Sequence, residues 1–233
     1  MLPVAILAGG LATRLGPLTG KLPKSLIPIA GEPFIAHQLR LVRSSGIQQV
    51  ILCIGHRGEM IERIVADGSA FGVKVEYSYD GSTLLGTAGA VRAALPKLSE
   101  KFFVMYGDSY LPCNYAAVEQ EFLRRGKLGL MTVYHNDGRW DASNVEFEAA
   151  RIIAYSKKDR TPHMRFIDYG LGVFRAEAFS RSGASDLADV YGELLKAGEL
   201  GALEVHERFY EIGSPAGLKE MTNFLSPPGD VRK

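Results

Sequence analysis

The chain has 233 residues, 46% of them hydrophobic and 23% charged, and its formal net charge is +1. These values are typical of a soluble globular protein, and the length suits one large α/β domain with a sizeable core. Because the charge is near neutral and no long basic run occurs, we expect neither a nucleic-acid partner nor a membrane partner.

The first apolar run, Val4–Ala8, is typical of a buried strand and ends at Gly9-Gly10. It has no basic flank and is too short for a signal peptide or a membrane span. Neither Cys53 nor Cys113 belongs to a C-x-x-C pair, so no disulfide framework is implied. We therefore expect a cytoplasmic protein.

Segments typical of helices and strands then alternate as far as residue 106. After a loop rich in Gly and Pro over 9–33, the pattern predicts helices over Phe34–Ser45, Glu59–Ala66 and Thr87–Leu98, and strands over Gln49–Ile54, Val73–Tyr79 and Phe102–Tyr106. This order predicts a three-layer α/β fold with a mainly parallel sheet, in which ligands bind beyond the carboxyl ends of the strands. Gly9-Gly10 and Asp108 both fall just after such strands, so we expect them at the same edge.

The second half of the chain is richer in strands. The pattern predicts strands over Leu128–His135, Asn144–Glu148, Ile152–Tyr155, Tyr169–Phe174 and Leu203–His206, and helices over Leu187–Ala197 and Ala216–Leu225. Because no linker separates the halves, we expect a single domain over residues 1–225, divided near residue 110. Residues 226–233 are expected to form a flexible tail.

The loop after the first strand combines glycines with basic residues. Glycines let the backbone approach a ligand closely and direct amide N–H groups at it, and phosphate is the natural ligand for such a nest. Arg14 adds a planar fork suited to phosphate oxygens, and Lys24 adds a mobile point charge. The loop does not match the Walker A pattern of a P-loop. A phosphate site is one interpretation, and a glycine-rich turn with solvated basic residues is the other.

The run Leu7–Thr19, followed by Pro23-Lys24, resembles the signature of the sugar-phosphate nucleotidylyltransferases. It contains their Gly-Gly loop, Thr-Arg-Leu, Pro-x-Thr and Pro-Lys elements in order. The resemblance implies a Rossmann-like nucleotidyltransferase fold whose first half binds the nucleotide and whose second half binds the sugar phosphate. It assigns the nucleotide to Leu7, Ala8, Gly9, Gly10, Thr13, Arg14 and Lys24. Arg14 and Lys24 are also expected to be catalytic.

Gly107-Asp108 resembles the Gly-Asp pair with which the family holds Mg²⁺. Asp108 is therefore expected to be a metal ligand and a catalytic residue, although a turn or cap role is the usual reason for an Asp at a strand end. The segment Tyr210–Pro215 is similar to a late family motif, in which Glu211 replaces the Asp that most members use as the second metal ligand. A structural role for Glu211 is the alternative.

The segment Leu85–Ala90 is similar to the family segment that packs under the nucleoside. That similarity implies nucleotide binding by Gly86, Thr87 and Ala88. It looks most like the guanylyltransferases for mannose and manno-heptose 1-phosphates. Nearby, a carboxylate at Asp80 would accept the N1–H and N2–H₂ donors of guanine together, but would repel a carbonyl oxygen of uracil. Asp80 therefore favours GTP, unless it only caps the Asp80-Gly81 turn.

The resemblance also locates the sugar phosphate. Lys157-Lys158 lies near a family Glu-Lys pair whose lysine meets the sugar phosphate, and Asp168-Tyr169 falls where many members have Asn-Ala. The residues expected to bind the sugar phosphate are Asn144, Lys157, Lys158, Asp168 and Tyr169. Lys157 replaces the Glu that usually holds sugar hydroxyls, and Asn144 could equally be a turn residue.

We therefore expect Mg²⁺-dependent transfer of a nucleoside monophosphate from an NTP, with GTP favoured, to a mannose- or heptose-like sugar 1-phosphate. The products would be an NDP-sugar and pyrophosphate. A uridylyl- or cytidylyltransferase acting on another sugar phosphate or phospho-alcohol is one alternative. A nucleotide-sensing subunit without catalytic activity is another, and a homodimer is compatible with the resemblance.

Overall fold

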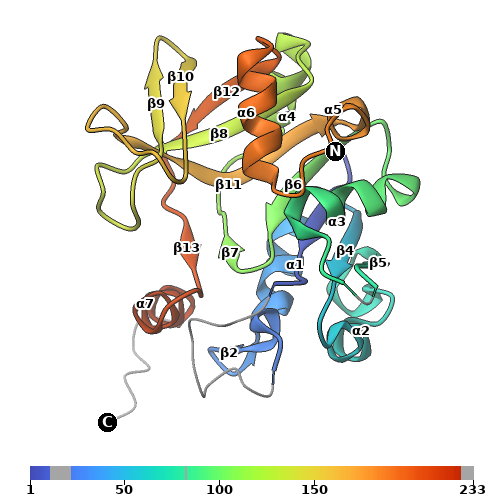
Figure 1. The fold of residues 1–233 in the computed structure, drawn as a ribbon. Coiled ribbons are helices and arrows are strands. Elements are labelled where there is room, and N and C mark those ends of the chain that lie inside the picture. Colours follow the sequence, from blue (N-terminus) through green and yellow to red (C-terminus); the bar gives the residue numbers. More distant parts are fainter. Residues whose placement is uncertain (11–21, 82, 227–233) are drawn as a thin grey trace.

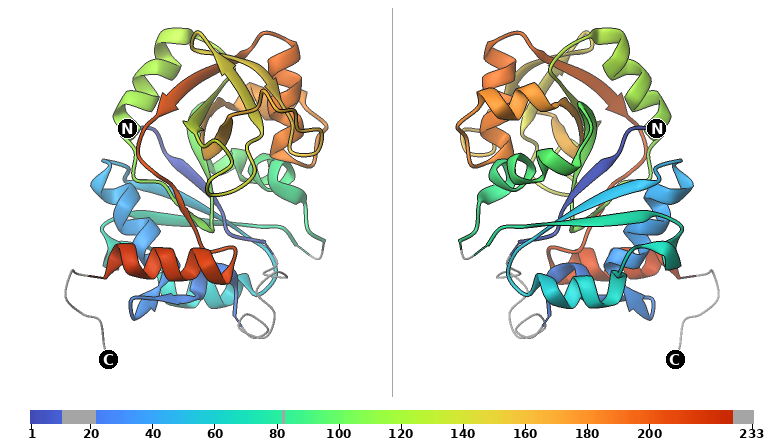
Figure 2. Two further views of the ribbon diagram at one scale, coloured as in Figure 1. Left: turned by 90° about the vertical axis from the view of Figure 1, so that its left-hand side faces the viewer. Right: turned by 90° about the vertical axis from the view of Figure 1, so that its right-hand side faces the viewer.

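The computed structural model of the protein describes residues 1–10, 22–81 and 83–226. Its largest element is a nine-stranded mixed sheet with helices on both faces (Figures 1 and 2). The main path through the sheet runs β10-β9-β11-β6-β1-β4-β5, and β8 pairs with both β11 and β12 beside that path. Strands from both halves of the chain thus share one sheet.

The first half of the chain supplies a parallel block of strands. β1 (Val4–Leu7) lies between β6 (Lys101–Tyr106) and β4 (Gln49–Ile54), and β4 pairs in turn with β5 (Lys74–Tyr79). All three pairings are parallel, so the carboxyl ends of these strands lie at one edge. The predicted α/β fold with a mainly parallel centre is confirmed.

Antiparallel pairing enters with the second half. β11 (Phe166–Arg175) pairs antiparallel with β6, with β8 (Gly129–His135) and with β9 (Val145–Glu148). β9 pairs antiparallel with β10 (Arg151–Tyr155), whereas β12 (Leu200–Val205) is parallel to β8. Through β11, residues of the second half are brought beside the end of β6.

Side chains alternate along each strand and give the sheet two apolar faces. On β1, Val4 and Ile6 face one core and Ala5 faces the other. The first core packs against α1 (Phe34–Ser44), α2 (Gly58–Val65) and α4 (Tyr115–Arg125). The second packs against α3 (Gly86–Ala94), α5 (Ala176–Arg181) and α6 (Leu187–Lys196).

A smaller apolar cluster lies below the sheet. There Met221 of α7 (Pro215–Leu225) packs with Ile29 of β2 (Pro28–Ile29) and with Ile212. β2 pairs with β3 (Glu32–Pro33), and β7 (Ser109–Tyr110) pairs with β13 (Tyr210–Glu211). The described residues also contain the short 3-10 helices η2 (Lys24–Leu26), η3 (Ser69–Phe71) and η4 (Leu95–Lys97).

The predicted elements differ from the structure mainly at helix ends, where a proline or a capping side chain sets the boundary. The helix predicted over Thr87–Leu98 ends at Ala94, since Pro96 lacks the amide hydrogen that another α-helical turn needs. α4, which begins at Tyr115, was not predicted, although Asn114 precedes it as a helix cap whose side chain accepts a hydrogen bond from the Ala117 amide. Within the predicted loop over 9–33, the described residues contain η2 and the β2–β3 pair. Apart from Ser226, the predicted tail lies outside the described residues.

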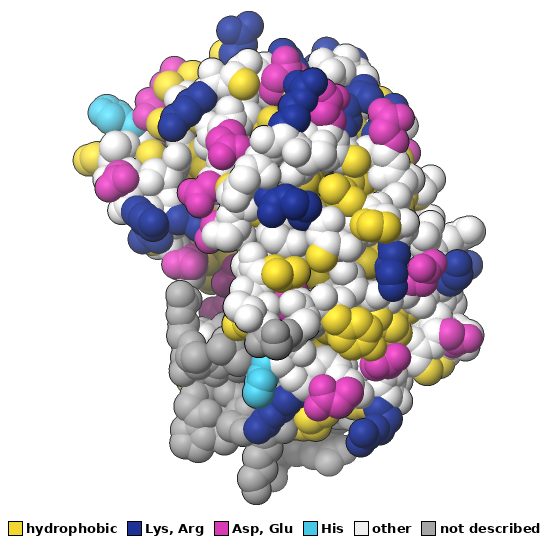
Figure 3. Space-filling model, turned by 45° about the vertical axis from the view of Figure 1, so that its right-hand side comes forward, with side chains coloured by type: hydrophobic (Ala, Val, Ile, Leu, Met, Phe, Trp, Pro, Cys, Tyr) yellow, Lys and Arg dark blue, Asp and Glu magenta, His cyan; other side chains and the backbone are white. Residues whose placement is uncertain are grey.

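No helix in the described part of the chain is long and apolar enough to cross a bilayer. On the face shown in Figure 3, basic and acidic side chains are interspersed rather than gathered by sign. The charge distribution of that face therefore resembles the near-neutral balance of the whole sequence.

Candidate functional site

A pocket lies at the carboxyl ends of the parallel strands, where the fold predicts a ligand site. Its lining comes from the ends of β1, β4, β5 and β6 and from the start of α3. The lining residues are Leu7, Ala8, Gly9, Gly10, Lys24, Ser25, Cys53, Asp80, Leu84, Gly86, Thr87, Ala90, Tyr106, Gly107 and Asp108. Most of the described residues assigned to the nucleotide thus meet in one cavity.

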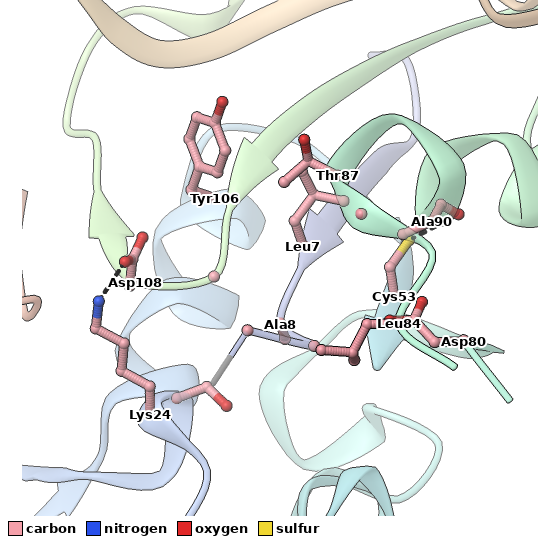
Figure 4. A pocket seen from close by; sticks show the side chains of 15 residues that line it. Leu7, Ala8, Lys24, Cys53, Asp80, Leu84, Thr87, Ala90, Tyr106 and Asp108 are labelled. Carbon is pink, nitrogen blue, oxygen red and sulfur yellow. Dashed lines mark hydrogen bonds and ion pairs between the residues drawn. The ribbon is translucent and has the colours of Figure 1, made fainter. Parts of the chain in front are cut away.

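Lys24 and Asp108 form an ion pair at one end of this pocket (Figure 4). The Lys24 Nζ lies 2.5 Å from the Asp108 Oδ2, although 84 positions separate the two residues in the chain. Their side chains remain 20% and 33% exposed, so a ligand in the pocket can reach both. The two described residues with predicted catalytic roles are therefore neighbours.

Backbone contacts fix the turn that carries Asp108. The Gly107 amide donates to the carbonyl of Leu7, and the Ile212 amide donates to the carbonyl of Asp108. A Cβ at position 107 would lie 2.7 Å from the Leu7 carbonyl oxygen, so glycine permits this close approach of β6 to β1. Asp108 consequently faces the pocket from a rigid strand end.

Glu211 lies near Asp108 on β13, which pairs with β7 directly after Asp108, but it is not among the residues that line the pocket. Glu211 is exposed at the surface, yet partial desolvation by its neighbours and the nearby Asp108 charge raise its pKa to about 7, against the opposing effect of Lys24. Two carboxylates that repel each other in this way favour a bound cation.

The carboxylates at this end are too few to form a metal site made wholly of protein ligands, but two carboxylates suit Mg²⁺. Among residues 1–10, 22–81 and 83–226 no group of three or more His, Cys, Asp or Glu side chains could hold a metal ion. Mg²⁺ commonly takes one or two carboxylates and completes its shell with phosphate oxygens and water. Asp108 and Glu211 fit that requirement.

Asp80 lies at the opposite end of the pocket, beside Leu84, with Leu7 and Ala8 between it and the ion pair (Figure 4). Asp80 directly follows β5, and its amide donates to the carbonyl of Ile54, the last residue of β4. This bond holds Asp80 beside the end of β4. Burial raises the pKa of the Asp80 carboxyl, and a hydrogen bond from the Leu85 backbone partly offsets that effect.

Two glycines leave room for the Asp80 carboxylate. A Cβ built at Gly55 would lie 2.9 Å from the Asp80 Oδ2, and one built at Gly9 would lie 3.3 Å from it. Side chains at those positions would crowd the carboxylate. The glycine loop therefore also shapes the end of the pocket that lies away from Lys24.

The start of α3 packs closely against the first residue of α6 and the segment before it. Gly86 has a φ of +74°, and a Cβ there would lie 2.4 Å from the Ser185 carbonyl oxygen. The Thr87 hydroxyl accepts from the Leu187 amide at 2.7 Å, so it helps to cap α6. Gly86 and Thr87 line the pocket, but Ala88 is fully buried and its amide donates to Ser185. Ala88 does not line the pocket, because both its side chain and its amide are engaged in the protein interior, and its contact with the nucleotide stays a prediction.

Lys157 and Asp168 lie together beyond Tyr106, a pocket residue that the sequence analysis did not single out. Lys157 donates from Nζ to the Tyr106 hydroxyl at 3.1 Å, and the Tyr155 hydroxyl donates to the Asp168 Oδ2 at 3.4 Å. Burial raises the pKa of Asp168, while the positive charge of Lys157 opposes that rise. Tyr106 ends its strand immediately before Gly107-Asp108, and that adjacency was the available signal.

The other predicted acceptor residues have different places. Asn144 is buried, and its Oδ1 accepts from the Asp168 amide at 2.9 Å, so its side chain supports Asp168. Lys158 is exposed on the loop after β10. The Tyr169 side chain is 2% exposed and packs against Tyr134 and Phe209 in the core, so its position does not support the predicted contact with the sugar phosphate. Neighbouring residues on a strand point to opposite faces, so Asp168 and Tyr169 cannot both face the site.

Thr13 and Arg14, also assigned to the nucleotide, lie outside the described residues.

Residues 4–208 match the nucleotidyl transferase family. This chain belongs to that family. The resemblance to sugar-phosphate nucleotidylyltransferases seen in the sequence is thereby confirmed.

Curated members of the family share moderate identity with the chain. A mannose-1-phosphate guanylyltransferase of Mycobacterium tuberculosis is 32% identical over 178 residues, which cover 76% of this chain and 49% of that protein. Mannose-1-phosphate guanyltransferase beta-B of Xenopus laevis is 27% identical over 219 residues, covering 90% of this chain and 61% of that protein. The chain therefore spans about half to three fifths of the length of these relatives.

Solved structures resemble the whole fold. HddC from Yersinia pseudotuberculosis superposes with a TM-score of 0.84 at 22% identity, covering 97% of this chain and 100% of that chain. A putative glucose-1-phosphate thymidylyltransferase from Bacillus anthracis gives a TM-score of 0.85 at 21% identity, covering 96% of this chain and 95% of that chain. At these identities the likeness establishes the Rossmann-like nucleotidyltransferase fold.

Proposed function

We propose that the protein transfers a nucleoside monophosphate from an NTP to a sugar 1-phosphate and releases pyrophosphate. The observation that carries the proposal is the Lys24–Asp108 pair, which lies in a pocket lined by the glycine loop and has Asp80 at its other end. A nucleotide placed along this pocket has its phosphates near Lys24 and its base near Asp80.

The reaction needs positioned charges more than a covalent intermediate. An oxygen of the sugar 1-phosphate attacks the α-phosphorus of the NTP in line, and the bond from that phosphorus to pyrophosphate breaks. Lys24 offsets negative charge on the triphosphate and on the leaving pyrophosphate, and Arg14 is proposed to do the same. Asp108 and Glu211 would hold Mg²⁺, which supplies further neutralisation of the phosphate charge when it is bound.

The acceptor is proposed to enter beside Tyr106 from the second half of the chain. Lys157 donates a hydrogen bond to the hydroxyl of Tyr106, which lines the pocket. The Lys157 ammonium group would therefore be available to the sugar phosphate beside the pocket. Asp168, supported by Asn144, offers a carboxylate to sugar hydroxyls. This arrangement disfavours a cationic acceptor such as a choline phosphate, because an ammonium group already occupies the entrance.

GTP and a mannose- or heptose-like sugar 1-phosphate are the proposed substrates. Asp80 can accept the two adjacent donors of guanine, and the two curated relatives described above are named as mannose-1-phosphate guanylyltransferases. A carboxylate near a uracil carbonyl would be repulsive. The base is therefore assigned on the chemistry of one side chain, and the sugar on family likeness.

The decisive experiment combines four NTPs with a panel of sugar 1-phosphates and Mg²⁺, and identifies each product by its mass. We expect GDP-sugar and pyrophosphate from a mannose or heptose 1-phosphate, and no product with the Asp108→Asn variant. If product forms only with UTP or CTP, the assignment of GTP is wrong, but the proposed transfer of a nucleoside monophosphate still holds. NTP binding without product from any acceptor would favour a nucleotide-sensing role and overturn the proposal.

A further inference from the structure

A glutamine outside the pocket holds the turn that carries Asp108. Gln38 lies on the buried face of α1 and is fully inaccessible to solvent. Its Nε2 donates to the Tyr106 carbonyl at 3.0 Å and to the Ser109 carbonyl at 2.7 Å. One side-chain amide thus bonds to the backbone on both sides of Asp108.

These two bonds add to the backbone contacts that already hold the turn. Its other backbone bonds, from Gly107 to Leu7 and from Ile212 to Asp108, approach from β1 and β13. Gly107 has no side chain of its own that could restrain the backbone. Gln38 reaches the turn from the helix layer and joins its two ends, which limits rotation of the backbone about Asp108.

Packing alone does not explain a glutamine at this position. The neighbouring residues on the buried face of α1, Ile35, Leu39 and Val42, are apolar and fully buried. A buried amide is unfavourable unless it is hydrogen-bonded, and the Gln38 Oε1 has no hydrogen-bond partner among the described residues. The Gln38 Nε2 donates both of its hydrogen bonds to the turn, whereas the Gln38 Oε1 accepts none. The side chain therefore supplies hydrogen bonds to the turn while one of its own polar atoms stays unpaired.

We propose that Gln38 is a positioning residue that aligns the Asp108 carboxylate for the metal-bearing end of the pocket. This inference rests on the proposed function, in which Asp108 holds Mg²⁺. Groups behind the ligands of a metal orient them, and changing such groups commonly costs about 10- to 100-fold in metal affinity or activity. Gln38 acts through the backbone, so we expect an effect near the lower value.

The test measures metal affinity directly, with Mn²⁺ as the probe and electron paramagnetic resonance as the readout, in the full chain with GTP present. Gln38→Leu keeps the size of the side chain and removes both donors. We expect it to raise the Mn²⁺ dissociation constant about tenfold and to raise the Mg²⁺ concentration for half-maximal turnover in parallel. The KM for GTP at saturating Mg²⁺ should change little.

Thr132→Val is the matched control. Thr132 is also fully buried, and its hydroxyl donates to the Leu171 carbonyl at 2.5 Å, within the sheet and away from the pocket. Both variants should lower the melting temperature, but only Gln38→Leu should weaken Mn²⁺ binding. Equal Mn²⁺ affinity in Gln38→Leu and the wild type would reduce Gln38 to a stability role and overturn the inference.

Gln38→Asn covers the case in which Gln38→Leu does not fold. Its amide sits on a shorter stem and can keep at most one of the two bonds, so we expect an intermediate loss of Mn²⁺ affinity. An unchanged affinity in this variant also overturns the inference, as does a wild-type protein that binds no Mn²⁺ with GTP. If the wild type binds Mn²⁺ but no acceptor reacts, the proposed function fails while the affinities still decide the role of Gln38.

Discussion

At one end of the pocket Lys24 and Asp108 form an ion pair with Glu211 nearby, whereas at the other end Asp80 lies beside two glycines and the apolar Leu84. The first end gathers charge of both signs around the place where phosphates would react. The second end offers one carboxylate with hydrogen-bonding capacity in an apolar setting. The first arrangement suits chemistry common to all NTPs, and the second suits a choice among bases.

This difference predicts two kinds of mutational effect. Changes at the charged end should slow turnover with every nucleotide, because charge stabilisation acts on the triphosphate that all NTPs share. Changes at the Asp80 end should mainly alter the ratio of kcat/KM values between nucleotides. Residues beyond Tyr106 should affect the acceptor alone.

The largest expected effect is that of Asp108→Ala. Loss of a carboxylate at the charged end should reduce kcat by a factor of the order of 10²–10³ with every NTP. Pyrophosphate release measures the rate, and circular dichroism checks the fold. Asp67→Asn, in an exposed turn just after α2, is the control and should behave as wild type. Activity of Asp108→Ala within a few-fold of wild type would remove Asp108 from the proposed site.

Lys157→Met should raise the KM for the sugar 1-phosphate by about tenfold to a hundredfold, the range expected for a lost hydrogen bond to a charged group. The KM for the NTP should stay the same. The adjacent Lys158→Met is the matched control, since Lys158 is exposed and Lys157 bonds to Tyr106. A larger effect from Lys158 would show that the acceptor enters on the other side of this loop.

Asp80→Ala should flatten the preference for GTP over UTP by roughly tenfold, because one carboxylate that accepts two donors is lost. Steady-state kcat/KM values for the two nucleotides give the ratio. The rate with the poorer nucleotide should be unchanged or higher, since the repulsion of its carbonyl is removed. A wild-type preference for UTP would contradict both the base assignment and the role of Asp80.

Glu211→Gln is expected to have the smallest effect. If Asp108 is the main protein ligand, loss of the second carboxylate should raise the Mg²⁺ concentration for half-maximal rate only a few-fold, with most of kcat retained at saturating metal. A Mg²⁺ titration of initial rates measures this. An unchanged titration would leave Asp108, substrate oxygens and water as the whole shell.

Much of the fold and the nucleotide end of the site was predictable from short stretches of sequence. Val4–Ala8, Gln49–Ile54 and Phe102–Tyr106 are apolar runs bounded by turn residues, a pattern that specifies a buried strand without knowledge of its neighbours. Because parallel strands end at a common edge, the residues after them could be expected together. Gly9, Gly10, Asp80 and Asp108 do line one pocket.

The second half was less predictable because its pairings are non-local. The sequence does contain a signal for Tyr169, since Ile167, Tyr169, Leu171 and Val173 alternate as one buried face of β11. That alternation would have placed Tyr169 in the core and Asp168 on the other face. For Tyr169 the strand periodicity is therefore a better guide to position than its proximity to a family motif.

By itself the sequence determined which residues could carry the chemistry, through a glycine loop, basic residues and carboxylates at strand ends. Only the tertiary structure decided which of them meet. Three contacts join distant segments of the chain. Lys24 lies 2.5 Å from Asp108, Thr87 accepts a hydrogen bond from the first residue of α6, and Gln38 donates to the turn that carries Asp108. Such contacts depend on strand register, helix packing and side-chain direction, which arise from the balance of the whole core and leave no local pattern in the chain.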